Sequence, residues 1–180
     1  MDICSKQKKY FLPKLASGTY VPCFGLTTEN SGSDAASMLD RGIVVVENGI
    51  LGMRVTFSKR YITLAPVASV IGLAFKLLDP NKLLTTGKEG ITVAILEKDK
   101  FSDIEIGNRH NPLNIGFMNG TIRGIDIFIP MECVIGGEEK CGFGWNMLME
   151  SLGEGRGISL PAMSLATAKL CSFGVGDMRV

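Results

Sequence analysis

The chain has 180 residues, enough for one domain or for one domain together with part of another. Its formal net charge of +1 gives no electrostatic reason to expect nucleic-acid binding. Hydrophobic residues make up 46% of the sequence and the mean hydropathy is +0.23, which suggests apolar surface that more chain or another subunit covers.

The five cysteines are scattered singly, without a CxxC pair, and the sequence has one histidine, His110. We therefore expect neither a metal site nor a disulfide framework, and isolated thiols fit a reducing compartment. No apolar run reaches the length of a membrane span, and the N-terminus lacks the apolar core of a signal peptide. The expected location is the cytoplasm if the source is bacterial, or the mitochondrion if it is eukaryotic.

Residues 1–16 carry apolar side chains behind a lysine-rich turn, which predicts the end of a helix with Pro13 inside it and Gly18 after it. Residues 20–130 read as short strands. Apolar or β-branched runs fall at 43–46, 55–57, 67–78, 91–96, 104–106 and 121–129. Asn48-Gly49 is typical of a hairpin turn between the first two runs. Six to eight strands at this spacing predict an antiparallel barrel or sandwich.

From about Trp145 onward the apolar residues return to approximately helical spacing. Glycines at 153, 155 and 157 interrupt this pattern. A glycine lowers helix stability by roughly 1 kcal/mol relative to alanine, so these positions indicate another group that packs close to the backbone.

The stretch 24–34 reads as a short apolar strand that turns abruptly into small polar residues. Gly32 can adopt backbone angles that other residues avoid, and the hydroxyls of Thr27 and Ser33 offer hydrogen bonds to a polar ring system or a phosphate. Composition alone favours an ordinary solvated turn over a binding site at this position.

The complete motif at residues 24–34, Phe24-Gly-Leu-Thr-Thr-Glu-Asn-Ser-Gly-Ser-Asp34, resembles the signature that opens the middle domain of acyl-CoA dehydrogenases. Residues 59–63, Lys-Arg-Tyr-Ile-Thr, are similar to that family's K-x-(W/Y)-I-T strand. Residues 119–130 resemble its late strand, and 142–145 with 154–156 resemble the start of its C-terminal helices. The four blocks follow the family's order and spacing, and the wording of 59–66 is nearest to the bacterial long-chain branch.

The resemblance implies a mainly β fold with flanking helices, namely the antiparallel β-barrel middle domain of this family. Residues 1–18 would be the end of an N-terminal helical domain. Residues 19–135 would form the flavin-binding barrel, and residues 136–180 the truncated start of a C-terminal helical domain.

The activity that the resemblance implies is FAD-dependent conversion of fatty acyl-CoA to trans-2-enoyl-CoA in fatty-acid β-oxidation. The reaction removes a proton from the α carbon and a hydride from the β carbon. The implied partners are the fatty acyl-CoA substrate and an electron-transfer flavoprotein or an equivalent acceptor. The full-length protein would be a homo-oligomer.

The resemblance also assigns the binding residues. The positions that would contact the flavin are Phe24, Leu26, Thr27, Gly32, Ser33, Tyr61, Ile62 and Thr63, and those for the substrate are Ser33 and Arg156. Tyr61 and Thr63 would point to the same side of a strand, since strand residues alternate between faces. Without the first block, both would read as ordinary barrel residues.

No catalytic residue is expected in this chain. The family places its catalytic glutamate either directly before the Arg156 position, where this sequence has Gly155, or far along the C-terminal domain beyond Val180. Glu154 is one residue away, which rotates it by roughly 100 degrees on a helix. Gly153 also departs from an aspartate that the family often carries. The fragment alone is therefore expected to be inactive.

Two other functions stay open. The missing base would also fit a non-catalytic binding or scaffold protein that keeps the fold. A lipid-carrying barrel without a cofactor would need only the strand pattern, but this function leaves the motif at residues 27–33 and the motif around Arg156 unexplained.

Overall fold

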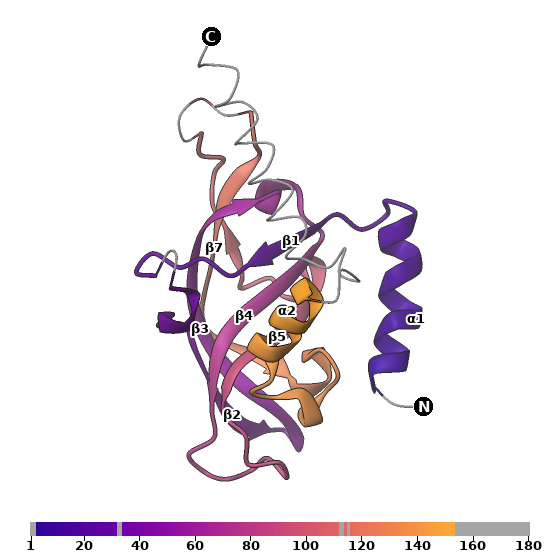
Figure 1. Cartoon of the computed structure of the whole chain (residues 1–180), viewed down its shortest axis with the longest axis vertical. Helices are drawn as coiled ribbons and strands as arrows, with labels where there is room; N and C mark the ends of the chain where they lie inside the picture. Colours follow the sequence, from indigo (N-terminus) through magenta and orange to yellow (C-terminus); the bar gives the residue numbers. More distant parts are fainter. Residues whose placement is uncertain (1–2, 32–33, 112–113, 115, 154–180) are drawn as a thin grey trace. The chain divides into compact units, whose positions relative to one another are not determined.

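The computed structural model describes residues 3–31, 34–111, 114 and 116–153. The chain divides into two compact units, residues 1–144 and 145–180. In chain order the helices and strands are α1 (Ile3–Ala16), β1 (Pro22–Gly25), β2 (Arg41–Glu47), β3 (Ile50–Thr63), β4 (Val70–Leu78), β5 (Gly90–Glu97), β6 (Glu105–Ile106), β7 (Asn119–Pro130) and α2 (Gly144–Gly153) (Figure 1). Short 3-10 turns lie at Ala35–Ser37, Ala65–Val67, Lys98–Lys100, Met131–Cys133 and Glu138–Lys140.

The strands form one sheet in the order β1-β4-β2-β3-β7-β6, and β5 pairs with the other edge of β4. Most neighbours are antiparallel, but β4 runs parallel to β1 and to the start of β2. The sheet curls back on itself, because the segment after β7 bonds to β5 through Ile135 N–H and the Val93 carbonyl at 2.9 Å. The predicted β-barrel middle-domain architecture is confirmed, as a half-barrel.

The β2–β3 hairpin turns at the predicted dipeptide. Asn48 and Gly49 have φ angles of 50° and 79°, which is the pair of left-handed conformations that a tight two-residue hairpin needs. The apolar run at 67–78 was expected to be strand throughout. Its strand begins at Val70 instead, because Leu64 is left-handed and Ala65–Val67 with Pro66 form a 3-10 turn.

The core fills the inside of the curled sheet. Fully buried members include Val44, Met53, Val55, Ile71, Leu73, Phe75, Leu77, Leu96, Ile122 and Ile129. β4 is buried from Val70 to Leu77 apart from Lys76, which explains why its sequence is almost continuously apolar.

The predicted N-terminal helix is confirmed. α1 contains Pro13, and Gly18 follows it at a φ of 74°. Gln7 joins this helix to the segment after β7, since its Nε2 donates to the carbonyls of Glu132 and Val134 at 2.9 and 2.8 Å. Its Oε1 accepts from Gly136 N–H at 3.1 Å.

In the second unit, the expected return to helix is confirmed for α2, and the remainder of that expectation lies outside the described residues. Within the described part of the chain, no helix combines the length and apolar character needed to cross a membrane.

Candidate functional site

The first motif begins on β1, whose side chains alternate between two faces. Cys23 belongs to the main core, whereas Phe24 and Leu26 pack against a small apolar cluster on the other face that contains Met38, Ala74 and Val93. Phe24 and Leu26 are therefore half-buried rather than fully enclosed. The strand ends in a sharp turn, marked by a 3.2 Å hydrogen bond from Leu26 N–H to the Phe24 carbonyl.

The loop that follows is closed around Thr28, which is not among the binding residues predicted from the sequence. The Thr28 hydroxyl is buried and accepts hydrogen bonds from the backbone N–H groups of Ser31 and Asn30 at 3.1 and 3.3 Å. At the tip of the loop Glu29 pairs with Arg123 of β7 at 2.8 Å, and this guanidinium lowers the pKa of the Glu29 carboxyl. The loop is thus fixed both internally and against β7.

The two sequence motifs meet in space. Arg60 N–H donates to the Thr27 carbonyl at 3.1 Å, and Thr28 forms an isolated β-bridge with Lys59. Thr27 therefore lies one strand position from Tyr61, although the two residues are far apart in the sequence. This contact is what a ligand shared by both motifs requires.

Tyr61 lies at an irregular point of β3. The pairing with β7 shifts between Lys59 and Ile62, and Tyr61 has a left-handed φ of 57°. The residue is 50% exposed. The Arg60 guanidinium lies 4.6 Å from the ring centroid, and His110 meets the ring edge-on with centroids 5.1 Å apart. A pocket of about 440 Å³ opens here, lined by Arg60, Tyr61, His110, Asn111 and Thr121.

The residues after Tyr61 diverge. The Ile62 side chain is buried in the core, so only its backbone can contact a ligand. Thr63 is half-buried, and its hydroxyl donates to Asn119 Oδ1 at 3.1 Å. Of the predicted binding residues, the structure brings Thr27 beside Arg60, next to Tyr61 on β3. Phe24 and Leu26 lie on the segment that leads into this turn, and Ile62 and Thr63 follow Tyr61 on β3. Gly32, Ser33 and Arg156, together with Glu154 and Gly155, lie outside the described residues.

Sequence reasoning missed the buried ion pair beneath this turn. Lys59 Nζ lies 2.5 Å from Asp40 Oδ2 and donates to the Leu26 carbonyl at 3.0 Å. The contact between Lys59 Nζ and Asp40 Oδ2 is an ion pair that does not have the geometry of a hydrogen bond. The other carboxylate oxygen, Asp40 Oδ1, accepts a hydrogen bond from Ser58 N–H at 2.9 Å. Burial lowers the pKa of Lys59, and Asp40 opposes that shift. The alternation of residues along β3 could have indicated that Lys59 is buried, because it follows Val55 and Phe57 at alternate positions that face inward.

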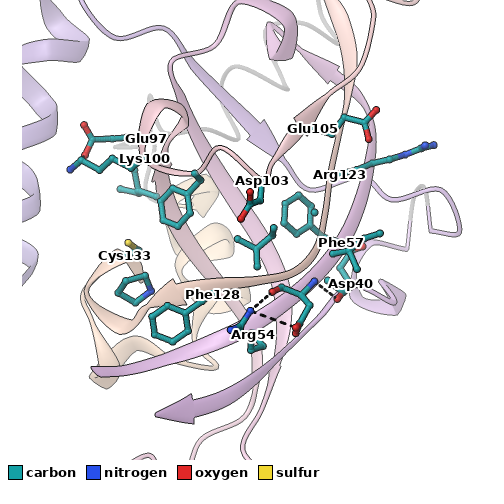
Figure 2. A pocket seen from close by; sticks show the side chains of 18 of the residues that line it. Asp40, Arg54, Phe57, Glu97, Lys100, Asp103, Glu105, Arg123, Phe128 and Cys133 are labelled. Atoms are coloured by element: carbon teal, nitrogen blue, oxygen red, sulfur yellow. Dashed lines mark hydrogen bonds and ion pairs between the residues drawn. The ribbon is translucent and has the colours of Figure 1, made fainter. Parts of the chain in front are cut away.

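A larger cavity of about 1770 Å³ is lined by α1, by several strands and, next to the polar turn, by Asn30, Asp40 and Ser58. Figure 2 shows Glu97, Lys100 and Asp103 on one side of it and Arg54 and Phe128 on another. Acidic and basic side chains both line this cavity, and none of the predicted binding residues that the structure describes is among its lining residues. Among the described residues, no cluster of histidine, cysteine and carboxylate side chains could hold a metal ion.

The site is therefore a polar turn hydrogen-bonded to Arg60, the residue before Tyr61 on β3 of the half-barrel. No protein-family model matches the chain. Protein HemX of Proteus mirabilis is 46% identical over 104 residues, which cover 57% of this chain and 61% of that protein. An acyl-CoA dehydrogenase of Bacillus subtilis (strain 168) is 32% identical over 166 residues, covering 92% of this chain and 41% of the relative.

Solved structures show the same fold. The acyl-CoA dehydrogenase from Geobacillus kaustophilus superposes with a TM-score of 0.64 at 23% identity, covering 81% of this chain and 36% of that one. The FAD complex of PigA superposes with a TM-score of 0.66 at 24% identity, covering 81% and 35%. The chain spans about two fifths of the length of the Bacillus relative. Over most of its length, this chain has the fold of the acyl-CoA dehydrogenase family, as the sequence motifs indicated.

Proposed function

We propose that this chain supplies the flavin-binding barrel of an enzyme that dehydrogenates fatty acyl-CoA to trans-2-enoyl-CoA in fatty-acid β-oxidation. The observation that carries the proposal is the 3.1 Å hydrogen bond from Arg60 N–H to the Thr27 carbonyl, which holds the two motifs together. The Bacillus relative is named an acyl-CoA dehydrogenase, and the PigA structure is an FAD complex.

The residues that the structure describes fit the isoalloxazine ring of FAD. Among them no hydrogen-bond partner is found for the Thr27 hydroxyl, which leaves it available to the polar edge of a ring. Tyr61 is 50% exposed as a residue, so its side chain is accessible for stacking on a flat ligand. The adjoining pocket of about 440 Å³ is of the size that small-molecule sites use. Thr63 can still accept a hydrogen bond while it donates to Asn119.

FAD, when bound, supplies the acceptor for the two electrons that leave the β carbon. In the proposed arrangement Leu26 and Thr27 bind the ring edge through backbone and hydroxyl groups, and Tyr61 orients the ring plane. Phe24 supports Leu26 from the apolar cluster beside it. Gly32 and Ser33 would continue the binding edge.

The remaining parts of the reaction are proposals about residues that the structure does not describe. Ser33 and Arg156 would bind the acyl-CoA. The base that removes the α proton would be a glutamate downstream of Val180. We also propose the three-part division at residues 1–18, 19–135 and 136–180, an electron-transfer flavoprotein or equivalent as acceptor, and a homo-oligomeric full-length protein.

Fluorescence titration of the purified chain with FAD tests the flavin assignment. We expect saturable quenching in the wild type, and weaker binding in Thr27→Val, which removes the hydroxyl while keeping the shape. Ile125→Ala is the matched control, because Ile125 is exposed on β7 away from both motifs. Absence of FAD uptake by the wild type, or equal affinity in Thr27→Val and wild type, would contradict the proposal.

The scaffold alternative is favoured by Gly155 at the position of the family's glutamate. Extending the chain by its downstream coding sequence separates the two functions. Bleaching of the flavin absorbance by fatty acyl-CoA supports the enzyme. FAD binding without such bleaching supports the scaffold.

A further inference from the structure

Lys59 is a charged residue in the interior of the barrel. Its side chain is 0% exposed, and the side chain of Asp40, its ion-pair partner, is 7% exposed. Removing two charges from water is costly, and well-packed apolar residues often replace such a pair without loss of stability. Core stability alone therefore gives little reason for a lysine and an aspartate in these two places.

The pair links three separate stretches of backbone. Asp40 precedes β2 and accepts a hydrogen bond from Ser58 N–H on β3 at 2.9 Å. Lys59, the next residue on β3, reaches from Asp40 to the Leu26 carbonyl at the end of β1, at 3.0 Å. Gly25 leaves room for this reach, since a Cβ at that position would lie 3.3 Å from Lys59 Cγ.

The end of β1 needs this link because the sheet does not supply it. β1 is hydrogen-bonded to β4, not to β3. Besides the Lys59 contact and the interaction of Glu29 with Ser58, the turn is tied to β3 by the Arg60–Thr27 hydrogen bond and the Thr28–Lys59 bridge. The hydrogen bond and the bridge involve Thr27 and Thr28, the residues immediately after Leu26, so the position of the Leu26 carbonyl bears on them directly.

We propose that Lys59 and Asp40 act as positioning residues that fix the Leu26–Thr27 peptide at a set distance from Tyr61. The inference rests on the proposed function, because that distance matters when one flat ring must meet the polar turn and the aromatic side chain together. Lys59 fixes Leu26, and Asp40 keeps the lysine charged and correctly aimed. Neither residue contacts the flavin in this arrangement.

The experiment compares Lys59→Met, Asp40→Asn and the double variant with wild type. Met keeps most of the volume of the lysine stem, and the double variant avoids leaving one charge buried alone. The matched control is Arg54→Met on the same strand, β3, which removes partly exposed ion pairs with Glu47 of β2 and Asp126 of β7. Three quantities are measured in the intact chain: amide hydrogen exchange of Arg60, FAD affinity, and the midpoint of thermal unfolding.

In the double variant we expect Arg60 exchange to accelerate and FAD affinity to fall, each by roughly tenfold, while amides in the middle of β3 keep their protection. Arg54→Met should leave both quantities within about twofold of wild type. A purely structural pair would speed exchange along all of β3 and lower the unfolding midpoint without changing FAD affinity of the folded protein. That result, or unchanged Arg60 exchange, would overturn the proposal.

Two further outcomes are informative. If the wild type takes up no FAD, the proposed function fails, while Arg60 exchange in the variants still decides whether the pair fixes the turn. If the variants do not fold, amide hydrogen exchange of the wild-type protein tests the inference instead. We then expect the Arg60 amide to exchange as slowly as amides in the middle of β3. Exchange of Arg60 at the rate of an exposed loop would contradict the inference.

Discussion

Raising the pH from about 8 to about 10 is expected to destabilise the barrel through two thiols, Cys23 and Cys141. Both side chains are fully buried, and burial raises the pKa of each from 9.0 to about 12. Above pH 9.0 the unfolded chain releases these protons while the folded chain keeps them. The stability that the thiols contribute is therefore complete below the unfolded pKa and is lost as the pH rises toward the folded one.

The magnitude follows from the two pKa values. At about pH 10 an unfolded thiol with a pKa of 9.0 is mostly ionised, which lowers the free energy of unfolding by about 1.4 kcal/mol per thiol. The two thiols together give about 3 kcal/mol, or a fall of roughly 6–12 °C in the unfolding midpoint for a chain of this size.

The assay is urea unfolding at both pH values, in a background where Cys4, Cys133 and Cys171 are alanine. A second protein also carries Cys23→Ala and Cys141→Ala, and the pH-dependent losses of the two proteins are compared. Lys59 acts in the opposite direction, since its lowered pKa makes stability rise with pH, but it does so equally in both proteins. Equal losses in the two proteins would refute the reasoning.

Three other changes test the site and the sheet. Tyr61→Ala should weaken FAD binding by about tenfold, since aromatic stacking contributes about 0.5–1.5 kcal/mol beyond burial, while Tyr61→Phe keeps most of it; equal flavin titrations for the two variants would argue against stacking. Thr28→Val removes the acceptor of two loop N–H groups and should lower stability to urea by about 1–2 kcal/mol, with Thr28→Ser close to wild type; unchanged stability in the valine variant would mean that water replaces the hydroxyl. Gly52→Ala would place a Cβ 2.7 Å from a carbonyl oxygen of β7 and should cost about 1–3 kcal/mol in thermal unfolding, whereas Gly116→Ala, with open space around it, should cost little. Similar midpoints for both glycine variants would show that the sheet adjusts freely.

Local patterns in the sequence predicted much of this fold. Alternation and turn chemistry located β2, β3, β5 and β7, and Asn48-Gly49 marked the hairpin. The parallel pairing of β1 and β4 could not be predicted in this way, since it depends on contacts between segments far apart in the chain.

The candidate site divides in the same way. The motifs at residues 24–34 and 59–63 could be recognised in the sequence, and their resemblance to a known family predicted that they lie close together. The Lys59–Asp40 pair went unnoticed because a lysine on a strand is normally solvent-facing. Its burial depends on an aspartate from another strand connection, which no local pattern identifies.

The hydrogen bond from Arg60 N–H to the Thr27 carbonyl fixes the position of one motif relative to the other. Residues inside each motif therefore cannot be added or removed, but the chain between the two motifs can vary in length. The Asn48–Gly49 tip is at the opposite end of β3, about 40 Å away along an extended strand. A peptide tag or a small reporter domain inserted at that tip should be accepted without disturbing ligand binding. A single residue added between Leu26 and Ser31 would displace the polar turn from its strand, so an engineer should treat these two places very differently.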